Sequence, residues 1–245
     1  MTRNIKLVIE YEGTNYLGWQ RQPHGLTIQE VIETSLERIT EENIKVIGSG
    51  RTDSGVHALG QVANFKTRSR LSTEDFQKGL NSMLPKDIAI IQAGEADAEF
   101  HAQFSAKSKV YVYRILNRDF PSALLRKRAW FIPYPLDTKL MNEAVLMLKG
   151  EHDFRAFALT GAEVKSTVRT VQDAAIEMQN GLLEFRIEAN GFLKRMVRLI
   201  VGTLVQVGKQ KITPVQFRDI LAAGEKMRYV YSAPPCGLYL KEVKY

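Results

Sequence analysis

The sequence has a single cysteine, Cys236, so a disulfide within the chain is impossible. Its histidines are few and scattered, and they form neither an HExxH pair nor a set with paired cysteines: His24, His57, His101 and His152. The Rossmann glycine fingerprint and the phosphate-binding P-loop are also missing from the sequence. We therefore expect no metal site and no nucleotide cofactor, which leaves a cofactor-free enzyme or a protein without catalytic activity.

Long hydrophobic runs are absent as well, and none approaches the length that spans a bilayer. Met1 leads directly into a strand-like pattern without the apolar core of a signal peptide. These two features predict a cytoplasmic protein without a membrane segment.

The composition that remains is that of an ordinary globular protein. The chain has 245 residues with a hydrophobic fraction of 44%, which suffices for one large domain or two smaller ones. Its net charge is +7, and this moderate excess favours an anionic partner, nucleic acid before a membrane surface.

Residues 50–65, GRTDSGVHALGQVANF, are the most informative stretch. One carboxylate, Asp53, stands between small polar residues, close to Arg51 and followed by His57, with glycines at positions 50, 55 and 60. Glycine permits backbone angles that other residues resist and lets a ligand approach closely. The pattern fits a displayed functional carboxylate, but a simple glycine-bracketed turn capped by an Asx side chain explains it equally well.

The number of carboxylates in this stretch favours some classes of enzyme over others. It holds no second carboxylate, which makes a two-acid hydrolase a poor fit. A solitary acid that a neighbouring arginine keeps ionised suits a nucleophile or a base better than a proton donor.

Hydrophobic periodicity predicts alternating strands and helices along the chain. Extended segments are expected at 4–10, 43–47, 61–65, 88–93, 108–116, 164–178, 183–187 and 238–243, and helices at 27–41, 72–84, 137–149, 192–207 and from Thr213 onward. Capping boxes are expected for Thr27 with Glu30 and for Thr213 with Gln216, and Asn180-Gly181 predicts a hairpin.

The order of these elements in the first half is strand, helix, strand, strand, helix, strand, and the second half repeats it with one spare helix. This order predicts an α+β protein of two similar split-βαβ, ferredoxin-like halves. We expect the halves to join into one extended, mostly antiparallel sheet with helices on one face and a central cleft. The predicted domains are residues 1–103, which carry the Asp53 loop, and residues 104–245, which carry the strand of Tyr111 and the helix of Arg198.

Three further features have two interpretations each. The tyrosine-bearing strand 108–116 is flanked by basic residues and fits either RNA binding or a solvated sheet edge: Lys107, Lys109, Arg118, Arg126, Lys127 and Arg128. Tyr16 and Trp19 in the loop 11–22 fit either base stacking or anchoring of that loop to the core. Arg198 fits either a solvated helix face shared with Lys194 and Arg195 or a side chain aimed at a phosphate or at Asp53.

The residues of these blocks resemble the tRNA pseudouridine synthase A family. The resemblance is carried, in order along nearly the whole chain, by YEGTNYLGWQRQ, GRTDSGVHALGQVANF, GLNSMLPKDI, FHAQFSAKSKVYVYRI, ANGFLKRMVRLIVGTL and the terminal GLYL. It implies isomerisation of uridine to pseudouridine at positions 38, 39 and 40 of the tRNA anticodon stem-loop. It also implies a cytoplasmic homodimer with the RNA crossing both subunits, and no metal or organic cofactor.

The same resemblance assigns roles to individual residues. Asp53 matches the catalytic aspartate, and Arg198 matches the basic residue that pairs with it. Tyr111 matches the tyrosine that packs on the target base, Arg51 matches the arginine linked to base displacement, and Leu238 lies in the block that lines the uracil pocket. A non-catalytic RNA-binding protein of the same fold, or a synthase for another structured RNA, remains the alternative.

Overall fold

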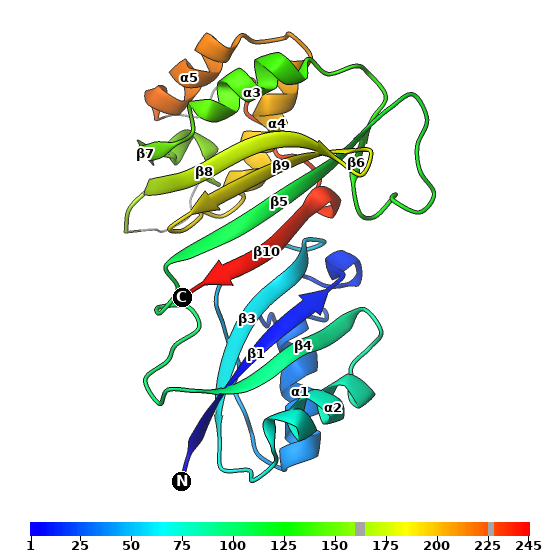
Figure 1. The fold of residues 1–245 in the computed structure, drawn as a ribbon, viewed down its shortest axis with the longest axis vertical. Helices are drawn as coiled ribbons and strands as arrows, with labels where there is room; N and C mark the ends of the chain where they lie inside the picture. The colour runs from blue at the N-terminus through cyan, green and yellow to red at the C-terminus, as the bar shows by residue number, and fades with distance from the viewer. Residues whose placement is uncertain (160–164, 225–227) are drawn as a thin grey trace. The chain divides into compact units, whose positions relative to one another are not determined.

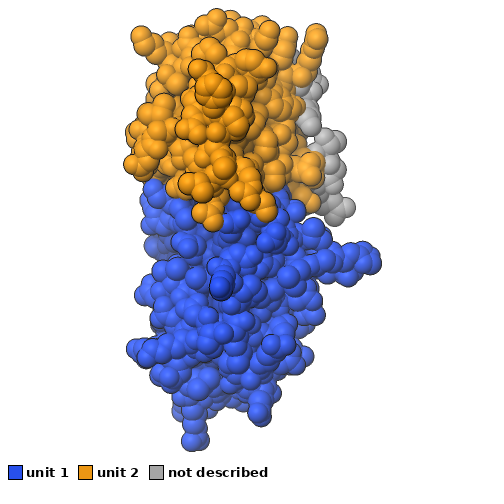
Figure 2. Space-filling view, turned by 90° about the vertical axis from the view of Figure 1, so that its right-hand side faces the viewer, with its two compact units in different colours: residues 1–107, 239–245 blue, residues 108–238 orange. Residues whose placement is uncertain are grey.

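The structure, a computed structural model, describes residues 1–159, 165–224 and 228–245. They form two compact units, which Figure 2 colours separately: residues 1–107 together with 239–245, and residues 108–238. Each unit combines a β-sheet with helices.

The first unit is built on a sheet in the order β4-β1-β3-β10, with β2 paired to β3 (Figure 1). Its strands are β1 (Arg3–Tyr11), β2 (Ile47–Gly48), β3 (His57–Thr67), β4 (Ile88–Ala96) and β10 (Leu238–Lys244). Strand β1 runs antiparallel to both β3 and β4. Strand β10 instead runs parallel to the start of β3, where Tyr239 pairs with His57.

Two helices, α1 (Ile28–Thr40) and α2 (Thr73–Met83), lie on one face of this sheet (Figure 1). Alternation along β1 buries its apolar side chains completely beneath them: Ile5, Leu7 and Ile9. Helix α2 starts at a reciprocal capping box between Ser72 and Asp75, which satisfies two backbone N–H groups of its first turn. A short 3₁₀ helix, η1 (Gly13–Asn15), follows β1.

The second unit is built on a sheet in the order β5-β9-β8-β7, with β6 paired to β5. Its strands are β5 (Ser108–Asn117), β6 (Trp130–Ile132), β7 (Gly150–Asp153), β8 (Val168–Gln179) and β9 (Leu182–Ala189). Its helices are α3 (Thr138–Leu146), α4 (Met196–Gly208) and α5 (Pro214–Ala223), with 3₁₀ turns η2 (Arg155–Phe157) and η3 (Pro235–Gly237).

Local sequence signals in this unit are confirmed. Asn180 and Gly181, with φ of 51° and 75°, form the tight turn between β8 and β9, as the hairpin signal predicts. Thr213 and Gln216 form the expected capping box of α5. Residue 164, where an extended segment was expected to start, lies outside the described residues.

The α+β class and the mostly antiparallel pairing are confirmed, whereas several boundaries differ from the predictions. Strand β3 starts at His57 rather than at residue 61, because β1 pairs with it from Ala58 onward. Helix α4 starts only at Met196, because Arg195 adopts a left-handed conformation with φ of 64°. Most of the expected strand 43–47 is irregular, because the N–H of Val46 bonds to Glu33 of α1 instead of to a strand.

One other sequence expectation needs correction. The Thr27 hydroxyl caps α1, but the Glu30 carboxylate lies 3.5 Å from Arg21 instead of completing a capping box. The final strand, β10, pairs with β3 of the first unit. The division into domains at residues 103 and 104 stays a prediction. Within the described ranges, no helix has both the length and the apolar character to cross a membrane.

Candidate active site

Asp53 lies in the loop that connects β2 to β3. Its side chain is half-buried, whereas Arg51 and Ser54 on either side are exposed and Thr52 is buried. The backbone N–H of Val56 donates to the carbonyl oxygen of Asp53 at 3.1 Å and closes a turn. The loop is therefore a glycine-containing turn, and it also presents its one carboxylate partly to solvent.

The loop that follows β1 holds Asp53 in place through the backbone on either side of it. The N–H of Trp19 donates to the carbonyl of Thr52 at 3.1 Å, and the hydroxyls of Tyr11 and Thr52 are 2.8 Å apart. The Ser54 hydroxyl donates to the carbonyl of Tyr16 at 3.1 Å. Because residues before and after the carboxylate are both fixed, its position is set by the fold rather than by a mobile loop.

Two glycines allow the loop after β1 to lie close to the Asp53 loop. A Cβ atom on Gly13 would lie 1.9 Å from the carbonyl oxygen of Val56, and one on Gly18 would lie 2.3 Å from that of Thr52. Gly18 also has φ of +89°, which disfavours any other residue. Contact between the two loops therefore requires glycine at both positions.

A buried polar network supports the start of the loop. The Ser49 hydroxyl donates to the side-chain carbonyl of Gln61 at 2.7 Å, and the Gln61 amide donates to the carbonyl of Gly50 at 2.9 Å. Gln61 is fully buried, so these bonds form where water does not compete. Burial raises the pKa of the nearby Tyr11 hydroxyl to about 12, against hydrogen bonds with Thr52 and Gln61 that lower it. The Tyr11 hydroxyl therefore stays neutral and can bond to Thr52 across the physiological pH range.

His57 fixes the end of the loop. Its ring is buried and stacks on Tyr239, with ring centroids 4.7 Å apart and planes at 27°. The Nδ1 atom accepts the backbone N–H of Gly13 at 3.1 Å, which requires that this nitrogen carry no proton. The imidazole thus connects the loop after β1, the start of β3 and strand β10.

The aromatic residues of the loop 11–22 anchor that loop to the core. Tyr16 and Trp19 are each only 3% exposed, which favours the anchoring interpretation over base stacking for both. The Tyr16 hydroxyl donates to Asp87 at 2.5 Å, and burial together with this carboxylate raises the pKa of Tyr16 above its usual value. Trp19 packs so closely on Gly48 that a Cβ there would lie 2.4 Å from the indole Nε1.

Tyr111 lies on β5 of the second unit, opposite Ile187 of β9. The residue is 7% exposed, and its ring meets Phe192 edge-to-face, with centroids 4.9 Å apart and planes at 77°. Tyr113 is completely buried, and its hydroxyl donates to the carbonyl of Pro234 at 2.8 Å. Strand β5 is therefore not a solvated edge, and Phe192 fixes the orientation of the Tyr111 ring.

Arg198 lies in the first turns of α4 and is bonded to the segment before β10. Its Nε donates to the carbonyl of Ala233 at 2.8 Å, and its own carbonyl accepts the N–H of Ala233 at 3.0 Å. Lys194 and Arg195 precede the helix, so the three residues do not form one helical face. The bond from Nε restricts the orientation of the guanidinium, so the Arg198 side chain does not belong to a solvated helix face.

The segment that leads to Leu238 is held by the same residues. Gly237 lies against the Tyr113 ring, where a Cβ would be 2.6 Å from a ring carbon. Cys236 is half-buried beside it, and burial raises the pKa of its thiol although the charge of Arg198 opposes this. Leu238 itself is 6% exposed at the start of β10. Arg198, Tyr113 and Leu238 are thus connected through residues 233–237.

The predicted site residues fall into two groups. Asp53 and Arg51 share one loop of the first unit, and Tyr111, Arg198 and Leu238 belong to the second unit. The pairing of Arg198 with Asp53 stays a prediction. Sequence reasoning assigned no supporting role to the residues that hold these groups: Gly13, Gly18, His57, Gln61 and Tyr113.

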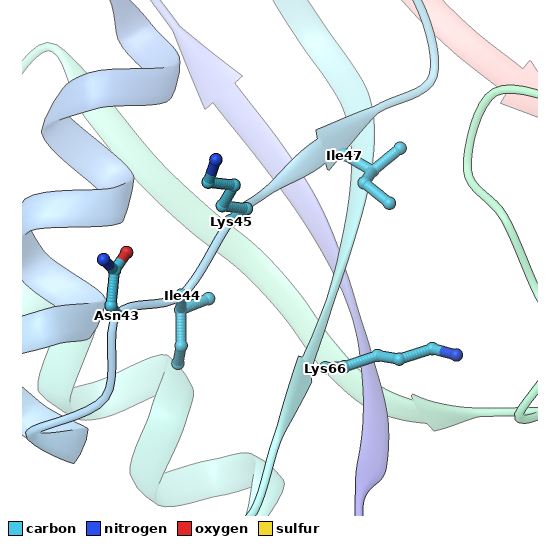
Figure 3. A pocket seen from close by; sticks show the side chains of 5 residues that line it. All are labelled: Asn43, Ile44, Lys45, Ile47 and Lys66. Atoms are coloured by element: carbon cyan, nitrogen blue, oxygen red, sulfur yellow. The ribbon is translucent and has the colours of Figure 1, made fainter.

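Elsewhere in the first unit, a pocket of about 470 Å³ lies beside β2 and β3 (Figure 3). It is lined by Asn43, Ile44, Lys45, Ile47 and Lys66, and the two lysine side chains do not point toward one another. It contains none of the predicted site residues. Among the described residues, no group of three or more His, Cys, Asp or Glu side chains is arranged to hold a metal ion.

Comparison with known proteins identifies the class to which this fold and site belong. The family model described as tRNA pseudouridine synthase matches residues 7–105 and 144–245. These ranges include four of the five predicted site residues, and only Tyr111 lies outside them. The chain belongs to the tRNA pseudouridine synthase family, which consists of isomerases.

The alignments with curated relatives span almost the whole length of this chain and of each relative. The chain is 47% identical over 243 residues to "tRNA pseudouridine synthase A" of Thermoanaerobacter sp. (strain X514), covering 99% of this chain and 100% of the relative. A protein of the same name from Acetivibrio thermocellus is 46% identical over the same shares of both chains. The crystal structure of a Cbf5-Nop10-Gar1 complex matches with a TM-score of 0.34 and 18% identity, over 82% of this chain and 45% of that chain.

Proposed function

We propose that this protein isomerises uridine to pseudouridine at positions 38, 39 and 40 of the tRNA anticodon stem-loop. It acts in the cytoplasm as a homodimer, with the RNA in contact with both subunits and without a metal or organic cofactor. The observation that supports catalysis most directly is the Asp53 loop, in which glycine contacts and hydrogen bonds fix the backbone and leave a single carboxylate half-exposed.

The reaction needs no external reagent. The bond between N1 of uracil and C1′ of ribose breaks, the base turns, and C5 bonds to the same sugar carbon. C5 then loses its proton and N1 gains one. The product contains the same atoms as the substrate, so neither an oxidant nor a group donor takes part. The demanding step is reaching the target, because a base must leave its stack at a cost of a few kcal/mol.

Asp53 acts in its anionic form. Its carboxylate attacks the sugar, attacks the base, or removes a sugar proton, and each of these roles requires an ionised group at the target nucleotide. Arg198 pairs with this carboxylate and stabilises its charge. The guanidinium of Arg198 suits that role because its Nε is already bonded to Ala233, which restricts its orientation.

The other three residues handle the base. The Tyr111 ring, whose orientation is set by Phe192, supplies a flat surface on which the displaced uracil packs. Leu238 contributes an apolar wall to the uracil pocket. Arg51 is exposed next to Asp53 and takes part in displacing the base from the stem. The basic charge of the whole chain favours binding to phosphates without regard to sequence, which fits an enzyme that modifies neighbouring positions.

A non-catalytic RNA-binding protein of the same fold is the second candidate function. The positive charge of this chain would suit RNA binding without catalysis equally well. A binding protein, however, has no requirement for a fixed, partly exposed carboxylate. Pseudouridine mapping in total RNA from a deletion strain separates the two candidates. Loss of modification at positions 38–40 of tRNA supports the proposal. Unchanged modification there, or loss only in another RNA, would overturn it.

A further inference from the structure

Residues 118–128, which connect β5 to β6, form a basic loop that the proposed chemistry does not use (Figure 1). This β5–β6 loop carries four exposed cationic side chains and one carboxylate, Asp119; the cations are Arg118, Arg126, Lys127 and Arg128. A large part of the chain's excess positive charge is therefore concentrated in eleven consecutive residues.

The β5–β6 loop has a defined conformation. Its ends are brought together because β5 and β6 pair, with Asn117 opposite Ile132. Inside it, the Nε of Arg118 donates to the carbonyl of Phe120 at 2.8 Å, and an Nη of Arg126 donates to that of Ala123 at 2.7 Å. A loop whose ends meet and whose interior is bonded in this way loses little conformational entropy when it binds a partner.

Leu125 ties the loop to the second unit. It packs against a small buried cluster that consists of Leu116, Ala129 and Leu182. The N–H groups of Arg128 and Ala129 both donate to the Leu125 carbonyl, at 2.9 and 3.0 Å. The loop is therefore anchored by one apolar side chain while its other large apolar side chains face solvent.

Two of these side chains are almost fully exposed. Phe120 has 76% and Leu124 has 86% of its surface accessible. A single exposed apolar residue is unremarkable in a soluble protein, but an exposed ring among cations matches the way proteins hold unpaired nucleotides. Aromatic rings stack on bases, while the surrounding cations neutralise phosphates.

We propose that the β5–β6 loop is a second contact surface for the RNA substrate. Phe120 stacks on an unpaired base, Leu124 packs beside it, and Lys127 contacts the phosphate backbone. The proposal rests on the proposed function in that it takes tRNA as the substrate. A second copy of the chain is the less favoured occupant, because a symmetric interface would bring the same cations of two loops together.

The test uses the full-length protein with two substituted forms, Phe120→Ala/Leu124→Ser and Lys127→Gln. Met178→Ser and Lys78→Gln are matched controls, because Met178 is 64% exposed and Lys78 is an exposed lysine of α2. The dissociation constant for unmodified tRNA is measured at several salt concentrations, together with the oligomeric state by light scattering.

We expect the apolar double variant to bind tRNA about 10-fold more weakly, with its oligomeric state unchanged. Lys127→Gln should reduce the slope of log affinity against log salt by about 0.7 to 0.9. The control variants should match the wild type. Wild-type affinity and salt slope in both loop variants would overturn the proposal, as would a change of oligomeric state in the double variant, which would assign the loop to a second copy.

Mapping the modified positions in the same reactions keeps this proposal separate from the proposed function. If wild-type protein modifies positions 38–40 and the loop variants bind tRNA normally, the loop proposal alone fails. If the loop variants lose tRNA affinity while the wild type forms no pseudouridine at those positions, the loop proposal stands and the proposed function fails.

Discussion

Gly18 lies directly against the peptide of Thr52, so that a Cβ atom at position 18 would be 2.3 Å from the Thr52 carbonyl oxygen. The next residue, Trp19, donates its N–H to that same oxygen at 3.1 Å. The backbones of the loop after β1 and of the Asp53 loop are therefore in direct contact. The position of the carboxylate depends on this contact.

Gly18→Ala should lower both stability and activity. Its φ of +89° is unfavourable for alanine by about 1–2 kcal/mol, and the clash with Thr52 adds to that and displaces Asp53. Chemical denaturation and kcat on unmodified tRNA measure the two effects. Gly224→Ala is the matched control, because Gly224 also has a positive φ, +67°, but an added Cβ there would have no atom of the described residues within 4 Å. Equal loss of activity in both variants would show that the contact with Thr52 is unimportant.

His57 should tolerate asparagine better than phenylalanine. The side-chain carbonyl of asparagine can accept the N–H of Gly13 in place of Nδ1, whereas phenylalanine keeps a ring beside Tyr239 and leaves that buried N–H without its acceptor. An unsatisfied buried donor costs about 1–3 kcal/mol. Unfolding free energies and kcat of His57→Asn and His57→Phe provide the comparison. If phenylalanine proved as good as histidine, the hydrogen bond would not matter.

Asp75 provides a prediction about pH. Hydrogen bonds from the Ser72 side chain and backbone hold the pKa of this carboxyl below its usual value of 3.8. A carboxyl with a lowered folded-state pKa stabilises the protein above its unfolded-state value, and this stabilisation disappears as the pH falls through the folded-state value. Asp75→Asn should therefore be less stable than the wild type at pH 7, and the deficit should shrink below about pH 4. A deficit that stays constant on acidification would exclude this linkage.

Sequence periodicity located the sheets and helices because those elements depend on local alternation and capping. The burial of Ile5, Leu7 and Ile9, the box at Ser72 and the turn at Asn180-Gly181 follow from residues close in sequence. The start of β3 at His57 could not be predicted in this way, because it depends on pairing with β1 and β10. The tight contacts around Asp53 likewise join residues about forty positions apart, which no local pattern encodes.

The site residues were identified by different signals. Asp53 was selected as the one carboxylate of a glycine-rich stretch, with Arg51 beside it. The resemblance to a family then added Leu238 and assigned specific roles to Tyr111 and Arg198. Their supporting bonds, such as that from Arg198 to Ala233, depend on the tertiary fold. The burial of Tyr16 and Trp19 shows the limit of composition, because aromatic residues beside an arginine look the same whether they bind RNA or fill a core.

The central claim is that the carboxylate of Asp53 performs the isomerisation, and Asp53→Asn tests it most directly because the substitution keeps the size of the side chain. The measurement is the rate of pseudouridine formation at positions 38–40 in a purified tRNA transcript, with the affinity for the same tRNA determined in parallel. We predict that tRNA binding persists while the rate falls by about 1,000-fold or more. A variant that binds tRNA and still forms pseudouridine at the wild-type rate would contradict the account.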